Sequence, residues 1–265
     1  MSDFCLVRGQ GRDVEIPNYF PSVRSIIQPR RGSGEISRRA SVEFANEIFC
    51  TWLANSIQLP VDTWQLWKEQ HHSLATGEHG LCFEGGKSYI KPTSRLCYAS
   101  WLPPDTDSSK CYEIIPSSWQ VRVANRNDIL GMLVFDLWIA ARRYRPVVYV
   151  GQADQTLHAL FLSHGNVFNI CGKGNIHFSP SIASMKSVLN IHYHALAGWT
   201  DDAIADWVDR LRSLEGESMQ QAFDYAYSNW QPNGWEAEVR EFLWKRSSLI
   251  DDLAESLRQE LKHLK

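Results

Sequence analysis

Between residues 41 and 61 the apolar side chains recur every three or four positions, which predicts a helix with one buried face. The apolar positions are Phe44, Ile48, Phe49, Trp52 and Leu53. Ser41 can cap the start of this helix. We expect it to end before Leu59-Pro60-Val61, because a residue before proline disfavours helical backbone. Upstream, the short apolar runs Val14–Ile16 and Val23–Ile27 predict strands.

A second helix is predicted from Asn127, a candidate cap, to Ile139. It is apolar almost all round, which is typical of a buried helix. Two apolar runs follow it, Val147–Val150 and His158–Leu162, and Gly151-Gln152 lies between them. This pattern predicts a β-hairpin.

The last third of the chain predicts helices. Thr200 is a candidate cap, with Asp201 and Asp202 in the first turn, where negative charge suits the helix dipole. Residues 217–229 form another candidate helix. The predicted last helix has an apolar face made of Val239, Phe242, Leu243, Ile250, Leu253, Leu257 and Leu261. We expect this face to dock on the domain; recruitment of a partner is the alternative.

Composition indicates an ordinary globular protein, with 265 residues, 44% hydrophobic and 22% charged. The net charge of −3 argues against a nucleic-acid partner. Five arginines near the start predict a solvated loop, or alternatively a phosphate-contacting surface: Arg24, Arg30, Arg31, Arg38 and Arg39. The 6 cysteines form no CxxC pair. With no apolar leader or membrane-spanning run, we expect a cytoplasmic protein that contacts no membrane.

Three stretches carry a family resemblance. The first is Asn46-Glu47, which opens the helix that ends at Leu59-Pro60-Val61. The second is Asn125–Ile139, and the third is Leu162-Ser163-His164-Gly165-Asn166-Val167-Phe168. In kind, order and spacing they resemble the HipA-like kinase domains of bacteria, over roughly residues 20–215.

The resemblance implies an α+β, bilobal kinase-like fold. Residues 1–120 would form a small mixed lobe with a β-sheet and one helix. Residues 121–265 would form a larger, mostly helical lobe with a β-hairpin at the cleft. ATP and Mg²⁺ are the cofactors that the family implies, although the residues themselves do not support them; no other cofactor is expected.

This sequence departs from the family where phosphoryl transfer needs acids. The family's Asn-x-Asp, followed by Arg, corresponds here to Ala141, Arg143 and Arg145, so only Arg145 matches. Ser163 stands at the position of the metal-binding Asp. Kinases hold Mg²⁺ and orient the attacking hydroxyl with carboxylates. Arg143 cannot accept a proton, because a guanidinium stays charged.

The nucleotide-binding and acidic residues each have two interpretations. Arg30 could contact phosphate where the family has a Lys, and Glu47 could pair with such an arginine or lie in solvent near the helix start. Asp136 or Asp154 could replace the missing acids. We favour a buried, satisfied Asp136 and a turn role for Asp154.

Two further patterns suggest weaker sites. His71-His72 and His192-Tyr193-His194 could ligate a metal, but no acid or Cys stands at ligand spacing nearby. Glu84-Gly85-Gly86-Lys87 superficially resembles a phosphate loop but misses the P-loop spacing by one residue, which favours an ordinary loop. Gly165 would provide backbone freedom in a tight turn.

Three functions stay open. The resemblance with the two replaced acids predicts a pseudokinase that binds an unidentified protein partner or a nucleotide. An active atypical phosphotransferase with relocated acids is the first alternative. The second is an interaction module without a nucleotide, within a toxin–antitoxin or defence system.

Overall fold

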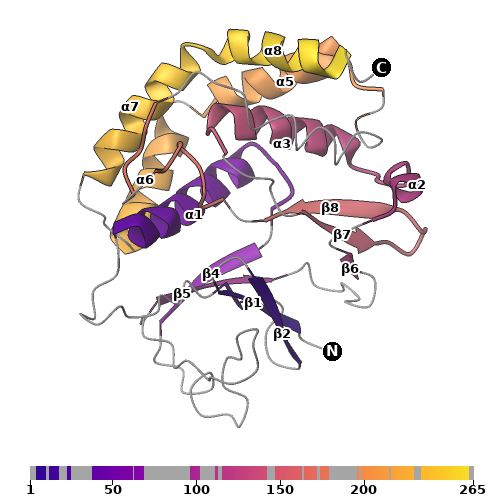
Figure 1. Cartoon of the computed structure of the whole chain (residues 1–265), viewed down its shortest axis with the longest axis horizontal. Coiled ribbons are helices and arrows are strands. Elements are labelled where there is room, and N and C mark those ends of the chain that lie inside the picture. Colours follow the sequence, from indigo (N-terminus) through magenta and orange to yellow (C-terminus); the bar gives the residue numbers. More distant parts are fainter. Residues whose placement is uncertain are drawn as a thin grey trace. The chain divides into compact units, whose positions relative to one another are not determined.

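The computed structural model in Figure 1 describes most of the chain in segments. They comprise residues 4–9, 12–17, 23–24, 38–61, 63–68, 96–101, 111–112, 115–141, 147–162, 164–171, 174–178, 196, 198–214, 216–229 and 234–262. The protein is a mixed α+β structure, as its sequence predicts.

The chain divides into two compact units. One comprises residues 1–40 and 62–109, and the other comprises residues 41–61 and 110–265. The first helix from Ser41 onward thus belongs to the second unit, whereas the expected boundary at residue 120 places it with the N-terminal sheet.

The first unit contains a five-stranded sheet in the order β2-β1-β3-β5-β4. Its strands are β1 (Phe4–Gly9), β2 (Arg12–Pro17), β3 (Val23–Arg24), β4 (Thr63–Lys68) and β5 (Leu96–Trp101). Strand β1 pairs antiparallel with β2 and parallel with β3. Strand β2 confirms the expectation for Val14–Ile16. Of the expected strand Val23–Ile27, β3 comprises Val23–Arg24, and residues 25–27 lie outside the described residues.

The second unit combines helices with a three-stranded sheet in the order β6-β7-β8. Its first elements are α1 (Arg38–Ser56), β6 (Cys111–Tyr112), α2 (Ser117–Gln120), α3 (Arg126–Trp138), β7 (Val147–Gly151) and β8 (Leu157–Phe161). Helices α5 (Asp201–Arg212), α6 (Glu217–Asn229), α7 (Trp235–Ser247) and α8 (Ile250–Lys262) follow. Strands β7 and β8 pair antiparallel, so the predicted hairpin is confirmed.

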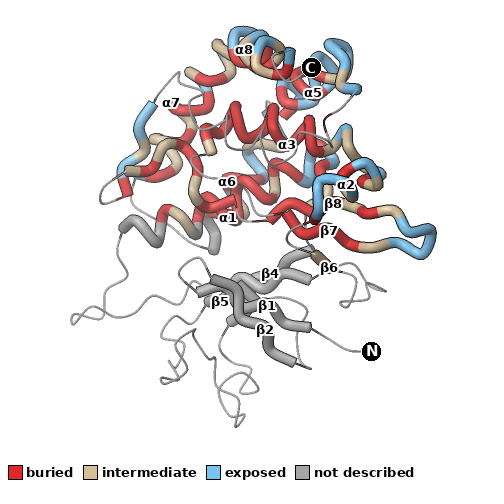
Figure 2. Tube along the Cα trace, turned by 45° about the vertical axis from the view of Figure 1, so that its right-hand side comes forward, coloured by how far each residue is buried: buried red, intermediate tan, exposed pale blue. Residues whose placement is uncertain are grey.

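Helix α3 forms the centre of the second unit. Every residue from Ile129 to Trp138 is buried, as the apolar pattern predicts (Figure 2). Helix α5 packs on it through Trp207, whose indole nitrogen donates to the Asn127 carbonyl at 3.0 Å. A Cβ at Gly131 would lie only 2.2 Å from the Trp207 ring, so the glycine allows the two helices to approach closely.

The start of α3 differs from the prediction. The residue preceding the helix is Asn125, and Asn127 lies within the first turn, so Asn127 is not the cap. The Asn125 side chain makes no capping bond to a backbone N–H of the helix, because its carboxamide pairs with β8 instead. It donates to the Ala159 carbonyl at 3.0 Å and accepts from the Ala159 N–H at 2.8 Å. Ser41 likewise lies inside α1, which begins at Arg38.

The long helix expected at the end of the chain is two helices. Helix α7 ends at Ser247 and α8 begins at Ile250. The Leu249 N–H bonds the Arg246 carbonyl at 3.0 Å, and the Ser248 hydroxyl bonds the Lys245 carbonyl at 2.8 Å, so the helical ladder is interrupted here. The expected apolar face is buried in both helices, which confirms docking on the domain.

The predicted cap of α5 is confirmed, and it supports a test. Thr200 Oγ1 accepts from the Ala203 N–H at 3.2 Å. We expect Thr200→Ala to lower the free energy of unfolding by about 1 kcal/mol, because it leaves that donor without its side-chain acceptor. Thr200→Ser should restore most of the loss in urea denaturation. Equal losses in both variants would contradict the capping role.

Candidate functional site

Helix α1 and the segment after β8 meet in a buried polar cluster. Asn46 Nδ2 donates to the Gly165 carbonyl at 3.3 Å, across 119 positions of sequence. His164 Nδ1 lies 3.2 Å from Thr51 Oγ1 and 3.9 Å from Glu47 Oε1. All five residues are buried. Two of the stretches that carry the family resemblance are therefore in direct contact.

Helical spacing explains how α1 presents these groups. Glu47 and Thr51 are four positions apart, so both lie on one face of the helix, toward the imidazole of His164. Asn46 lies beside this face of α1, and its Oδ1 accepts from Trp235 Nε1 at 2.7 Å. Because Trp235 is a donor only, this bond fixes the orientation of the carboxamide and directs its NH₂ to Gly165.

Gly165 is required for space rather than for backbone freedom. Its φ lies outside the left-handed region, so the expected need for backbone freedom is wrong. A Cβ at this position would lie 2.6 Å from the Glu43 carbonyl oxygen and 3.2 Å from Glu47 Oε2. The missing side chain lets the segment approach the backbone of α1.

The second stretch, which contains α3, also reaches this cluster. The rings of Phe135 and His164 are 6.3 Å apart, and the Phe168 N–H donates to the Ile139 carbonyl at 2.8 Å. The donor Phe168 (φ 56°) is left-handed, and so are the neighbours Ala140 (φ 48°) and Asn169 (φ 49°). Left-handed backbone is unfavourable for residues with a Cβ and is concentrated at functional sites.

The segment after β8 also holds two buried polar atoms, Asn166 Oδ1 and Asn169 Nδ2. Neither has a hydrogen-bond partner among the residues that the structure describes. Buried polar atoms are normally paired, so an unpaired acceptor and an unpaired donor in one segment indicate a place for a polar ligand or water.

The two candidate replacement acids lie in different surroundings. Asp136 is buried in α3, where its side chain lies inside the helical unit. Asp154 lies in the turn of the hairpin, and its Oδ1 accepts from the Thr156 N–H at 3.0 Å and from the Thr156 hydroxyl at 2.7 Å. These bonds lower the pKa of Asp154. Asp154 thus has the geometry of a turn residue.

Several predicted site residues lie outside the described part of the chain. They are Arg30, Arg143, Arg145 and Ser163, together with His71, His72, His192, His194 and residues 84–87. Of the remaining predicted residues, Glu47 lies in the cluster, and Asp136 lies on α3. Within the described segments, no group of three His, Cys, Asp or Glu side chains is arranged to hold a metal ion.

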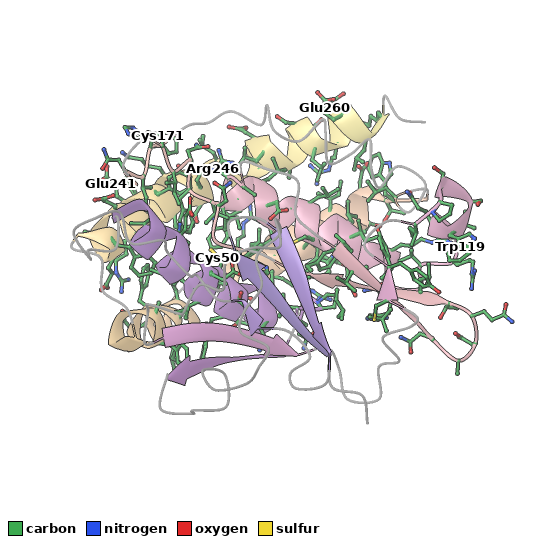
Figure 3. All side chains as sticks on the ribbon, turned by 60° about the horizontal axis from the view of Figure 1, so that its bottom comes forward. Cys50, Trp119, Cys171, Glu241, Arg246 and Glu260 are labelled. Atoms are coloured by element: carbon green, nitrogen blue, oxygen red, sulfur yellow. The ribbon has the colours of Figure 1, made fainter. Side chains whose placement is uncertain are left out.

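Sequence reasoning missed Arg246, the buried cation of the C-terminal helices. Its side chain is fully buried and donates to the carbonyls of Leu137 and Trp138 at the end of α3, with Nε 3.2 Å from the Trp138 oxygen (Figure 3). Burial lowers the pKa of Arg246 to about 10, so the guanidinium remains charged at neutral pH. A signal was present, because Arg246 interrupts an otherwise apolar helix face at helical spacing.

Among the described helices, none has the length and apolar character needed to cross a membrane. No family model matches the sequence, and no curated protein sequence matches it either.

Proposed function

We propose that this chain is a kinase-like protein of the HipA class that acts by binding a nucleotide or a partner protein, without ordinary phosphoryl transfer. One observation carries the proposal: the three stretches that resemble the family, distant in sequence, converge on His164 and Gly165. Asn46 bonds Gly165, Phe135 packs beside His164, and Ile139 bonds Phe168. A chance resemblance gives no reason for these segments to meet.

The order of elements supports the same proposal. Helix α3 leads into residues 139–146, then into the β7–β8 hairpin, and then into the segment at His164. In a kinase-like arrangement, this hairpin connects the catalytic loop to the metal-binding loop. A small sheet unit and a larger helical unit suit the two lobes of such a protein.

The residue types support binding rather than transfer. Arg143 and Ser163 replace the acids that would orient the hydroxyl and hold Mg²⁺. The neutral groups of the same segment could still contact a nucleotide, because Asn166 Oδ1 is an oxygen ligand of the kind that Mg²⁺ takes and Asn169 Nδ2 is a donor for a phosphate oxygen. When bound, Mg²⁺ would neutralise phosphate charge.

An active enzyme with relocated acids has less support. Strand β8 has five residues, so Asp154 in the hairpin turn lies about 15 Å along the strand from Leu162. Asp136 is buried within the helical unit and already has an interaction partner, whereas Asn166 Oδ1 and Asn169 Nδ2 have none among the described residues.

A phosphoryl-transfer assay tests the proposal. We expect purified chain with radiolabelled ATP and Mg²⁺ to show no autophosphorylation or ATP hydrolysis above a buffer control, because no carboxylate stands at positions 143 and 163. We also expect titration calorimetry with Mg-ADP to detect binding, and Asn166→Ala to weaken it about tenfold.

Two results would contradict the proposal. Robust Mg-ATP-dependent transfer that is lost in Asp136→Asn would show an active enzyme. Absence of nucleotide binding, together with absence of any bound protein when the tagged chain is isolated from its host, would remove both binding roles.

A further inference from the structure

Helix α7 contacts the segment Gly165–Phe168, or the residues that hold it, at three points along its length. At its start, Trp235 Nε1 bonds Asn46 Oδ1, and Asn46 bonds the Gly165 carbonyl. At its middle, the rings of Phe242 and Phe168 are 5.3 Å apart. Near its end, Arg246 bonds the last turn of α3, about 16 Å along the helix from Trp235.

At the end of α7, Arg246 and Ser247 hold the last turn of α3. Arg246 donates to two carbonyls of that turn, and Ser247 Oγ accepts from Trp138 Nε1 at 3.2 Å. The next residue, Ile139, accepts from the Phe168 N–H. Contacts from both ends of α7 therefore lead to the same segment.

Stability alone does not explain why a cation is buried at position 246. Removing an ionic group from water is costly, and well-packed apolar residues often replace buried charges at no loss of stability. The guanidinium instead supplies several rigid donors to two carbonyls in the last turn of α3, one of which, that of Leu137, also accepts the Ala140 N–H. Its charge opposes the negative end of the α3 dipole. Its placement fixes where α3 ends and where residues 139–146 begin.

We propose that α7 is a positioning element for the candidate site, with Arg246 and Trp235 as its positioning residues. They hold the end of α3 and the segment Gly165–Phe168 in the geometry that a nucleotide phosphate would meet. The ligand in this statement rests on the proposed function, whereas the positioning itself does not.

Hydrogen–deuterium exchange on the full chain without ligand tests the positioning. We expect Arg246→Met to speed exchange at least tenfold in peptides covering 139–141 and 164–170, while peptides from α5 and α8 change less than twofold. Arg246→Lys should recover part of the protection, because it keeps the charge and a donor. Lys245→Met is the matched control, because it also replaces a cation with methionine at the neighbouring position. Lys245 forms an exposed ion pair with Glu241, so we expect this change to leave exchange unchanged.

A second variant covers the case in which Arg246→Met fails to fold. Trp235→Phe keeps an aromatic ring but removes the indole donor to Asn46, and we expect faster exchange confined to 164–170. Uniform acceleration across all helices, or no acceleration in either variant, would overturn the proposal, because it would leave α7 an ordinary packing helix.

Mg-ADP is the probe that connects positioning to binding. We expect the dissociation constant of folded Arg246→Met for Mg-ADP to rise about tenfold, and Lys245→Met to bind as the wild type does. An unchanged constant would overturn the role of α7 in binding. Absence of wild-type binding would instead count against the proposed nucleotide role, and the exchange experiment would still decide whether α7 positions the segment.

Discussion

Gly131→Ala is expected to lower the free energy of unfolding by about 2–3 kcal/mol, although alanine is the better helix former. An added methyl group would lie 2.2 Å from the Trp207 ring. The indole cannot simply rotate away, because it is fully buried and its nitrogen bonds the Asn127 carbonyl. Helices α3 and α5 would have to separate.

A double-mutant cycle isolates this clash. Trp207→Leu alone leaves a cavity and should cost about 2–4 kcal/mol. In that background, Gly131→Ala should be neutral or stabilise by up to about 1 kcal/mol, since the methyl group then has space. Urea denaturation of the four proteins gives the coupling energy. Equal costs of Gly131→Ala in both backgrounds would show that the ring is not the obstacle.

Gly165→Ala is the second substitution with a large expected effect, about 2–3 kcal/mol of unfolding free energy. The methyl group would lie 2.6 Å from the Glu43 carbonyl, which belongs to the backbone of α1 and cannot turn aside. The segment must move outward, and the bond from Asn46 to the Gly165 carbonyl should break. In ¹⁵N-indole NMR spectra, we expect the Trp235 signal to shift, because its acceptor is Asn46.

Gly198→Ala is the matched control for that substitution. Gly198 has a φ of 87° and open space around its Cβ position, so it should show only the conformational cost, about 1 kcal/mol. The Trp235 signal should not move. If Gly165→Ala cost no more than Gly198→Ala and left the indole signal in place, the close approach to α1 would be disproved.

Local periodicity was enough to predict the elements with a clear apolar pattern. Helix α3, the β7–β8 hairpin and the Thr200 cap depend on contacts between near neighbours in sequence, so a short window contains their causes. The cap of α3 could not be predicted from local sequence. Asn125 bonds a strand 34 positions later, and no local rule distinguishes it from Asn127.

The candidate site was predictable only in part, and through resemblance rather than periodicity. That resemblance indicated Glu47 as a site residue and drew attention to the stretch that contains His164, and the structure brings these two side chains together. It gave no indication of Trp235 or Arg246, whose roles arise from packing of the C-terminal helices on α1 and α3. Arg143 and Ser163 remain predictions outside the described residues.

The aromatic packing of α1 has a consequence during synthesis of the chain. Phe49 lies 4.4 Å from the ring of Phe223 and 5.7 Å from that of Trp235, and the bond from Trp235 to Asn46 joins residues 189 positions apart. At roughly 5–20 residues per second, α1 leaves the ribosome about 10–40 seconds before its partners. During that interval its apolar face has no native cover, so the nascent chain should depend on chaperones that bind exposed hydrophobic helices.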